Sequence, residues 1–127
     1  MKHSVISAYL HENLKDCQLI DDNHICGRIL FTPDFPGFDG HFPGFKLVPG
    51  VCLVETVRCT FEKALQTRVQ TVKIKSCRFR AQVVPDTAVE IKITVKELAP
   101  AHWQLQSEIM TGEVSALRVS LEVEKEG

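Results

Sequence analysis

The residues 33–50 hold four prolines and four glycines, a density that neither a helix nor a strand tolerates. The same stretch carries four phenylalanine side chains that would not be left in water without cost: Phe35, Phe38, Phe42 and Phe45. We therefore predict an ordered loop whose aromatic side chains pack against the rest of the chain. Pro49 and Gly50 end this loop and open a segment that continues to about Thr67 without another helix breaker.

The segment after Gly50 has the pattern of a buried helix. Its first turns are apolar nearly all round, through Val51, Cys52, Leu53, Val54 and Val57. Its second half is amphipathic, with Phe61, Ala64 and Leu65 set against Glu62, Lys63 and Gln66. A helix that is apolar on most sides needs a partner that surrounds it.

The rest of the chain predicts a short N-terminal amphipathic helix over about 4–15 and a series of strands. The strands are expected near 25–31, 72–80, 89–95, 103–109 and 117–123, with a change of phase near Ser76 and Cys77 that suggests a bulge. Turns are expected at Pro85-Asp86, Ala99-Pro100 and Thr111-Gly112. One near-apolar helix with several half-wet strands predicts a single α+β domain over 1–127, in which an antiparallel sheet curls around the helix.

The composition of the chain excludes several classes of function. The 127 residues carry a net charge of -1, which argues against a nucleic-acid binder that relies on a strong basic field. The chain shows neither an apolar run of membrane-spanning length nor the apolar core of a signal peptide, so we expect a cytoplasmic protein. The five cysteines are odd in number and form no Cys-x-x-Cys pair, which predicts reduced thiols rather than disulfides or a zinc site.

Two ionisable residues are candidates for acid/base chemistry. His41 sits in the Gly/Pro loop and titrates near neutrality. Glu55 lies among Leu53, Val54 and Val57, where an ionisable group is costly unless it has a role or a partner. The free backbone amides at a helix start can bind a developing negative charge. These parts suit the formation and protonation of an enolate, although a hydrogen-bonded structural histidine and a solvent-facing glutamate are the simpler alternatives.

Two motifs resemble a known family. The first is Phe38-Asp39-Gly40-His41-Phe42-Pro43-Gly44, followed by Pro49-Gly50-Val51 and Glu55, and it resembles the signature of the 3-hydroxyacyl-[acyl-carrier-protein] dehydratases of the FabZ/FabA type. The second, residues 77–85, is similar to the strand and turn that follow the central helix in that family. The resemblance covers roughly 25–98. It implies a hotdog fold, in which a curved antiparallel sheet wraps a long helix, and a homodimer in which the histidine of one subunit meets the acid of the other.

The resemblance also implies roles for individual residues. His41 would take the C2 proton of a (3R)-3-hydroxyacyl thioester, Glu55 would orient or protonate the leaving hydroxyl, and the Gly50 N–H would donate to the thioester carbonyl. Other motif residues would contact the substrate, namely Phe42, Pro43, Gly44, Pro49 and Val51. Residues Phe42, Phe45, Leu47, Val51 and Val54 fit an acyl tunnel and core packing equally well. The reaction requires no metal and no organic cofactor.

The acyl carrier protein is the partner that the family implies. Basic residues suited to docking this acidic protein are Lys73, Lys75, Arg78 and Arg80, with Lys46 and Arg58, although a solvated strand face explains them more simply. The other histidines, His3, His11, His24 and His102, have polar surroundings and are expected to be structural.

The chain departs from the housekeeping FabZ pattern in several places. Phe45-Lys46 stands where Arg-Pro is usual, Cys59 replaces a common glutamine, and Pro85-Asp86 replaces Pro-Gly-Asp. These changes favour a specialised member that serves a secondary lipid, polyene or polyketide pathway. Glu55, in place of the aspartate of the FabA branch, favours dehydration without obligatory isomerisation. A hotdog thioesterase and a non-catalytic acyl-binding hotdog subunit are the alternatives.

Overall fold

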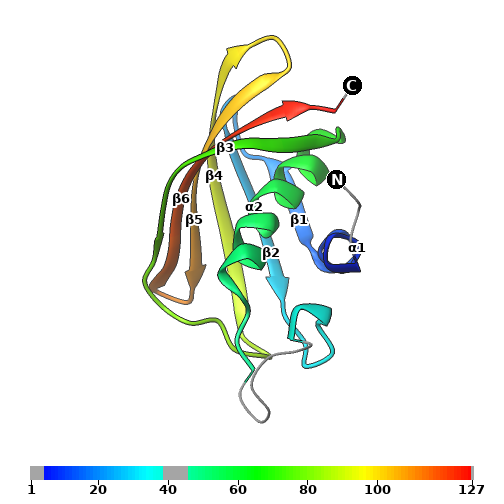
Figure 1. Cartoon of the computed structure of the whole chain (residues 1–127), viewed down its shortest axis with the longest axis vertical. Coiled ribbons are helices and arrows are strands. Elements are labelled where there is room, and N and C mark those ends of the chain that lie inside the picture. The colour runs from blue at the N-terminus through cyan, green and yellow to red at the C-terminus, as the bar shows by residue number, and fades with distance from the viewer. Residues whose placement is uncertain (1–4, 39–45, 127) are drawn as a thin grey trace.

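The curved sheet and the helix it encloses are the main features of the computed structural model, which describes residues 5–38 and 46–126 (Figure 1). The elements, in chain order, are α1 (Val5–Asn13), β1 (Lys15–Leu19), β2 (His24–Leu30), the one-turn 3-10 helix η1 (Pro36–Phe38), α2 (Gly50–Leu65), β3 (Val69–Phe79), β4 (Ala88–Ala99), β5 (His102–Thr111) and β6 (Val114–Lys125). The order in the sheet is β1-β2-β4-β5-β6-β3, so β1 and β3 form its edges. Every pairing is antiparallel.

Alternating side chains explain why the sheet wraps α2. In β4 the side chains of Val89, Ile91 and Ile93 are buried while Glu90, Lys92 and Thr94 are exposed, so one face of the strand is apolar and the other wet. Leu105 of β5 and Leu121 of β6 are likewise fully buried. The buried residues of α2 form one core cluster with them, which confirms the predicted α+β architecture.

The structure corrects some boundaries. The strand β1 was not predicted, because only Cys17 among its side chains is even partly buried and the strand shows no apolar alternation. The helix α1 ends at Asn13, before the expected Lys15, and the Asn13 side chain donates to the Tyr9 carbonyl. The predicted bulge is confirmed as a register shift between Ile74 and Ser76 in the pairing of β3 with β6.

The Gly/Pro segment is ordered on its N-terminal side. Phe35 and Phe38 are 1% and 6% exposed, and their rings meet edge to face at 5.2 Å. The Phe35 ring also lies 4.9 Å from those of Tyr9 and Phe31. This aromatic cluster confirms that the first half of the segment packs on the core, with a single 3-10 turn as its regular structure. Phe42 and Phe45 lie outside the described residues.

Val51, in the first turn of α2, is more exposed than the sequence predicts. Val51 is 71% exposed, whereas Cys52 and Leu53 beside it are 2% exposed, so one side of the first turn faces the surface and the other faces the core. Val54 is buried in the core, so core packing accounts for it. All five cysteines are described and all are free thiols, and Cys52 and Cys59 are packed in the core, as predicted.

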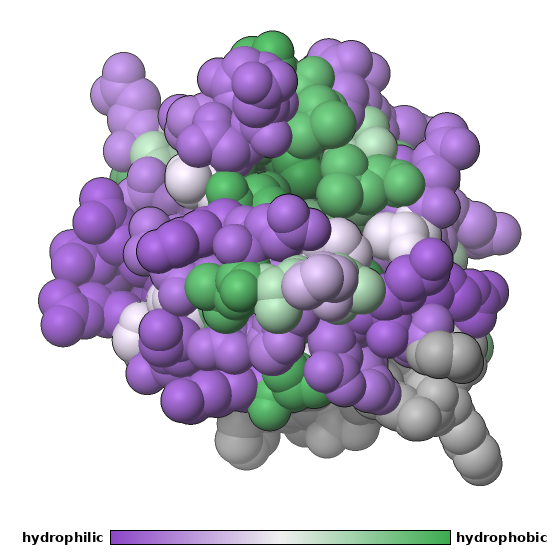
Figure 2. All heavy atoms as spheres, turned by 90° about the horizontal axis from the view of Figure 1, so that it is seen from above, coloured by the Kyte–Doolittle hydropathy of each residue, from purple (hydrophilic) through white to green (hydrophobic). Residues whose placement is uncertain are grey.

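Apolar side chains also reach the surface elsewhere. Seen from above, the molecule is mostly hydrophilic, with groups of apolar side chains set among the polar ones (Figure 2). Across the described ranges, 5–38 and 46–126, no helix is both long and apolar enough to cross a membrane.

Close contact between β2 and α2 gives a first prediction. A Cβ atom at Gly27 would lie 2.8 Å from Cγ2 of the buried Thr60 and 3.1 Å from Sγ of Cys17. We expect Gly27→Ala to lower the free energy of unfolding by about 1–3 kcal/mol, since the packed helix cannot give way. Adding Thr60→Ser, which removes the obstructing methyl group but keeps the hydroxyl, should recover part of this loss. Urea unfolding of both variants tests it, and a Gly27→Ala protein as stable as the wild type would contradict it.

Candidate active site

The predicted site residues divide into two groups. His41, Phe42, Pro43 and Gly44 lie outside the described residues. Pro49, Gly50, Val51 and Glu55 are described and lie at the start of α2. The geometry of the site is therefore built here from the helix and from the two segments that flank residues 39–45.

These flanking segments are anchored near each other. Lys46 Nζ donates to the Pro33 carbonyl at 3.1 Å and lies 5.9 Å from the centre of the Phe38 ring. The Val48 amide donates to the Val83 carbonyl at 2.8 Å, which ties the approach to α2 onto the segment that follows β3. Phe38 and Lys46, the described residues on either side of this gap, thus lie close to each other, and Val48 is held two residues before α2 begins.

The start of α2 provides the expected amide groups. The Pro49 carbonyl accepts hydrogen bonds from the Cys52 and Leu53 amides at 2.9 and 3.2 Å. The amides that come before the first intrahelical bonds have no intrahelical acceptor, and the helix dipole adds partial positive charge there.

Gly50 has a second reason to be glycine. A Cβ atom at this position would lie 2.5 Å from the ring of Phe79, at the end of β3. The family resemblance implies only that the Gly50 N–H donates to the thioester carbonyl. The absence of a side chain also lets the Phe79 ring cover the helix start.

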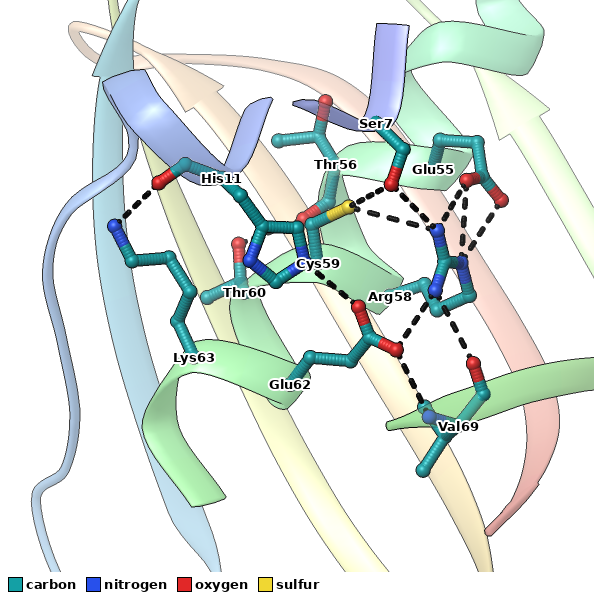
Figure 3. A network of polar contacts seen from close by, with 10 residues as sticks. All are labelled: Ser7, His11, Glu55, Thr56, Arg58, Cys59, Thr60, Glu62, Lys63 and Val69. Atoms are coloured by element: carbon teal, nitrogen blue, oxygen red, sulfur yellow. Dashed lines mark hydrogen bonds and ion pairs between the residues drawn. The ribbon is translucent and has the colours of Figure 1, made fainter. Parts of the chain in front are cut away.

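Glu55 is held by an arginine one turn further along α2. Arg58 Nε donates to both carboxylate oxygens of Glu55 at 3.1 Å, and Arg58 Nη2 donates to Oε2 at 2.7 Å (Figure 3). The Glu55 side chain is 20% exposed, whereas that of Arg58 is 5% exposed. The sequence predicted that Glu55 needs a role or a partner, and Arg58 is a partner.

Arg58 is in turn fixed on its other side. Nη1 lies 2.9 Å from Oε2 of Glu62 and donates to the Val69 carbonyl at 3.1 Å, and Nη2 donates to Ser7 Oγ at 3.3 Å. Burial opposes the charge of Arg58, but the hydrogen bonds to Glu55 and the nearby carboxylates outweigh it and raise the pKa of Arg58 above its ordinary value. The guanidinium is a permanent charge in this site.

Glu62 completes the network that joins α1, α2 and β3. Its Oε1 lies 2.7 Å from His11 Nε2, and its Oε2 accepts from the Val69 amide at 2.8 Å (Figure 3). Two sequence-based interpretations are therefore wrong: Glu62 is not on a solvent-facing side of α2, and Arg58 is too buried to dock a carrier protein. The signal that was available is the spacing Glu55, Arg58, Glu62, which places all three on one helix face.

The remaining charged residues behave as the simpler interpretation predicts. Lys46, Lys73, Lys75, Arg78 and Arg80 are exposed. Three histidines form structural contacts with carboxylates: His11 with Glu62, His24 with Asp21 and His102 with Glu122. His3 lies outside the described residues.

One cluster has the residue types of a metal site. The potential ligand atoms of His11, Cys59 and Glu62 all lie within 4.8 Å of one another. However, Arg58 lies against the same group, with Nη2 3.7 Å from Cys59 Sγ and Nη1 on the second oxygen of Glu62. A guanidinium at this distance repels a divalent cation, so the donor set suits a hydrogen-bonded network better than a metal.

Comparison with known proteins settles the family. Residues 17–116 match the family model described as ApeI-like, ApeI dehydratase. The chain belongs to the ApeI-like dehydratase family. It is also 30% identical over 108 residues to the 3-hydroxyacyl-[acyl-carrier-protein] dehydratase FabZ of Cereibacter sphaeroides, covering 77% of this chain and 70% of the relative. The FabZ of Desulforamulus reducens is 30% identical over 111 residues, covering 82% of this chain and 78% of the relative.

Solved structures confirm the hotdog fold. The dehydratase heterocomplex ApeI:P from Xenorhabdus doucetiae superposes with a TM-score of 0.71 at 17% identity, covering 88% of this chain and 96% of that chain. A hypothetical thioesterase with coenzyme A from Streptococcus pneumoniae gives a TM-score of 0.69 at 12% identity, covering 96% of this chain and 92% of that chain. At these identities the likeness establishes the fold alone.

Cys59, which replaces a glutamine common in FabZ, gives a second prediction for this ApeI-like protein, on how its stability depends on pH. Burial raises the pKa of Cys59 to about 12 from its ordinary value of 9.0. The folded state thus keeps this thiol protonated at pH values where the unfolded chain ionises it, so its contribution is complete below pH 9.0 and is lost as the pH rises toward 12.

The matched variant is Cys59→Ala, which lacks the thiol. We expect this variant to be less stable than the wild type at pH 7 by about 1 kcal/mol, because it leaves a small cavity. The two stabilities should converge between pH 9 and 11. Denaturant unfolding at each pH measures the gap, and a gap that stays constant would contradict the assigned ionisation.

Proposed function

We propose that this chain, as a single dehydratase domain, converts (3R)-3-hydroxyacyl-[acyl-carrier-protein] thioesters to trans-2-enoyl thioesters. Membership of the ApeI-like dehydratase family supports the reaction class. The observation that carries the proposal for this chain is the partly exposed Glu55 carboxylate, fixed in α2 close to the helix start at Gly50. His41, with its family spacing to both, supplies the base.

These groups account for every proton and electron pair that moves in the dehydration. His41 takes the C2 proton, and the electron pair moves toward the thioester carbonyl, where the Gly50 N–H and the helix start stabilise the enolate oxygen. The C3–O bond then breaks, the C2–C3 double bond forms, and the hydroxyl leaves as water with the proton that His41 returns. A carboxylate held by Arg58 is suited to accept a hydrogen bond from the C3 hydroxyl, which favours an orienting role for Glu55.

We infer that the active unit is a homodimer. β3 is an edge strand, and its Val72, Ile74 and Phe79 side chains are 43%, 52% and 54% exposed. An edge strand with apolar side chains favours pairing with a second chain. The family resemblance implies that in such a dimer His41 of one subunit meets Glu55 of the other. Because the solved structure of ApeI from Xenorhabdus doucetiae is a dehydratase heterocomplex, ApeI:P, an assembly with a different subunit is the alternative.

The carrier protein is the proposed source of the substrate. Lys73, Lys75, Arg78 and Arg80 are exposed along β3 and just beyond it, and they offer positive charge to an acidic partner. The departures from the housekeeping pattern, including Cys59, favour a specialised lipid, polyene or polyketide pathway in the cytoplasm.

Hydration of trans-2-enoyl thioesters, the reverse reaction, tests the proposal. We expect hydration by the wild type, and a loss of about 10²–10⁴-fold in kcat/KM for both His41→Ala and Glu55→Gln, since each removes a group that acts on the reacting atoms. His102→Ala is the matched control, because His102 bonds Glu122 on the sheet and should leave the rate unchanged.

Comparing a chain-length series on coenzyme A and on carrier protein identifies the substrate class. Full activity in both His41→Ala and Glu55→Gln would contradict the assignment of the catalytic residues. Release of free thiol without hydration would favour the thioesterase alternative.

A further inference from the structure

We propose that Arg58 is a positioning residue, whose guanidinium holds the Glu55 carboxylate in the orientation that the reacting thioester requires. This inference rests on the proposed dehydratase function and adds a residue that the motif does not contain. It follows from how the nitrogens of Arg58 are divided between Glu55 and its buried anchors (Figure 3).

The contact with Glu55 restrains more than its charge. Nε reaches both carboxylate oxygens, and Nη2 reaches Oε2 at 2.7 Å. Contacts from two nitrogens to two oxygens define the plane of the carboxylate as well as its position. A glutamate that is partly exposed would otherwise sample several rotamers, so this contact removes freedom that would misplace a reacting group.

Arg58 can do this because it is itself immobile. Its Nη1 is bound to Glu62 at 2.9 Å and to the Val69 carbonyl at 3.1 Å. Glu62, with 3% of its side chain exposed, is held in turn by His11 and by the Val69 amide. The anchor therefore extends across three elements, α1, α2 and β3, and ends at the outward-facing Glu55.

A purely structural role does not account for this division. Neutralising the buried Glu62 requires only Nη1, which already contacts it. Nε, on the other side of the guanidinium, donates to Glu55 instead. The Glu55 side chain is 20% exposed, so water could solvate its carboxylate without Arg58. The fork is thus directed at Glu55, which is the acid of α2 nearer to the helix start.

The experiment compares three variants of the whole 127-residue chain. Arg58→Met removes both charge and fork, Arg58→Lys keeps the charge but offers a single point of contact, and Lys63→Met is the matched control. Lys63, also on α2, donates to the His11 and Leu14 carbonyls at 2.7 Å, so its loss weakens the docking of α1 without touching Glu55. The readouts are kcat and KM for hydration of a trans-2-enoyl thioester, together with the melting temperature.

We expect kcat to fall about 10–100-fold in Arg58→Met, with KM changed less than about threefold, because the acid is misplaced while the binding surface remains. Arg58→Lys should lie between Arg58→Met and the wild type. Lys63→Met should lower the melting temperature and keep kcat within about twofold of the wild type. If Arg58→Met does not fold, Arg58→Met/Glu62→Gln removes the charge left unpaired and takes its place.

The outcomes separate the two proposals. A wild-type protein that hydrates no enoyl thioester overturns the proposed function and, with it, the role of Arg58. An active wild type whose kcat is unchanged in Arg58→Lys and in the Arg58→Met or double variant overturns the positioning role alone. The positioning role is also overturned if kcat falls as far in Lys63→Met as in Arg58→Met, because the loss of activity would then follow the loss of stability.

Discussion

The burial of one charged helix face is the constraint on which the rest of this structure depends. The sheet surrounds α2, yet Glu55, Arg58 and Glu62 share a face of that helix and Arg58 and Glu62 are almost fully buried. A buried charge is tolerated when it is paired and hydrogen-bonded, and removal of one partner from such a pair typically costs about 3–5 kcal/mol. Here the Arg58 guanidinium lies between two carboxylates and also donates to the Val69 carbonyl, to Ser7 Oγ and to Cys59 Sγ.

This network links the stability of the fold to the geometry of the site. The inner carboxylate, Glu62, joins α1 to α2 through His11 and joins α2 to β3 through the Val69 amide. The outer carboxylate, Glu55, is the one with the spacing of a dehydratase acid. One arginine thus serves an interior contact and a surface-facing one, and the second depends on the rigidity of the first.

Much of the fold could be predicted because periodicity reports burial directly. The alternation in β4 and the near-apolar start of α2 predicted a sheet around a helix, and both are present. The strand β1 could not be found in the same way, since it lies at the sheet edge with both faces largely wet. Arg58 and Glu62 were misplaced for a related reason: charge predicts exposure only until a partner of opposite charge shares the interior. The position of Glu55 and Gly50 on α2 was predicted, whereas the partner of Glu55 was visible only in the spacing of three charges. The proposed role of His41 is inferred from its motif and from family membership.

Complementation between inactive subunits tests the central claim most directly. His41→Ala and Glu55→Gln proteins, each inactive alone, are mixed in equal amounts, dissociated and reassembled, and assayed for hydration of a trans-2-enoyl thioester. If each site takes its histidine from one subunit and its acid from the other, mixed dimers carry one intact site, and activity returns to about a quarter of the wild-type value. Reassembled mixtures that stay inactive, while wild-type protein survives the same treatment, would contradict a site shared across a homodimer.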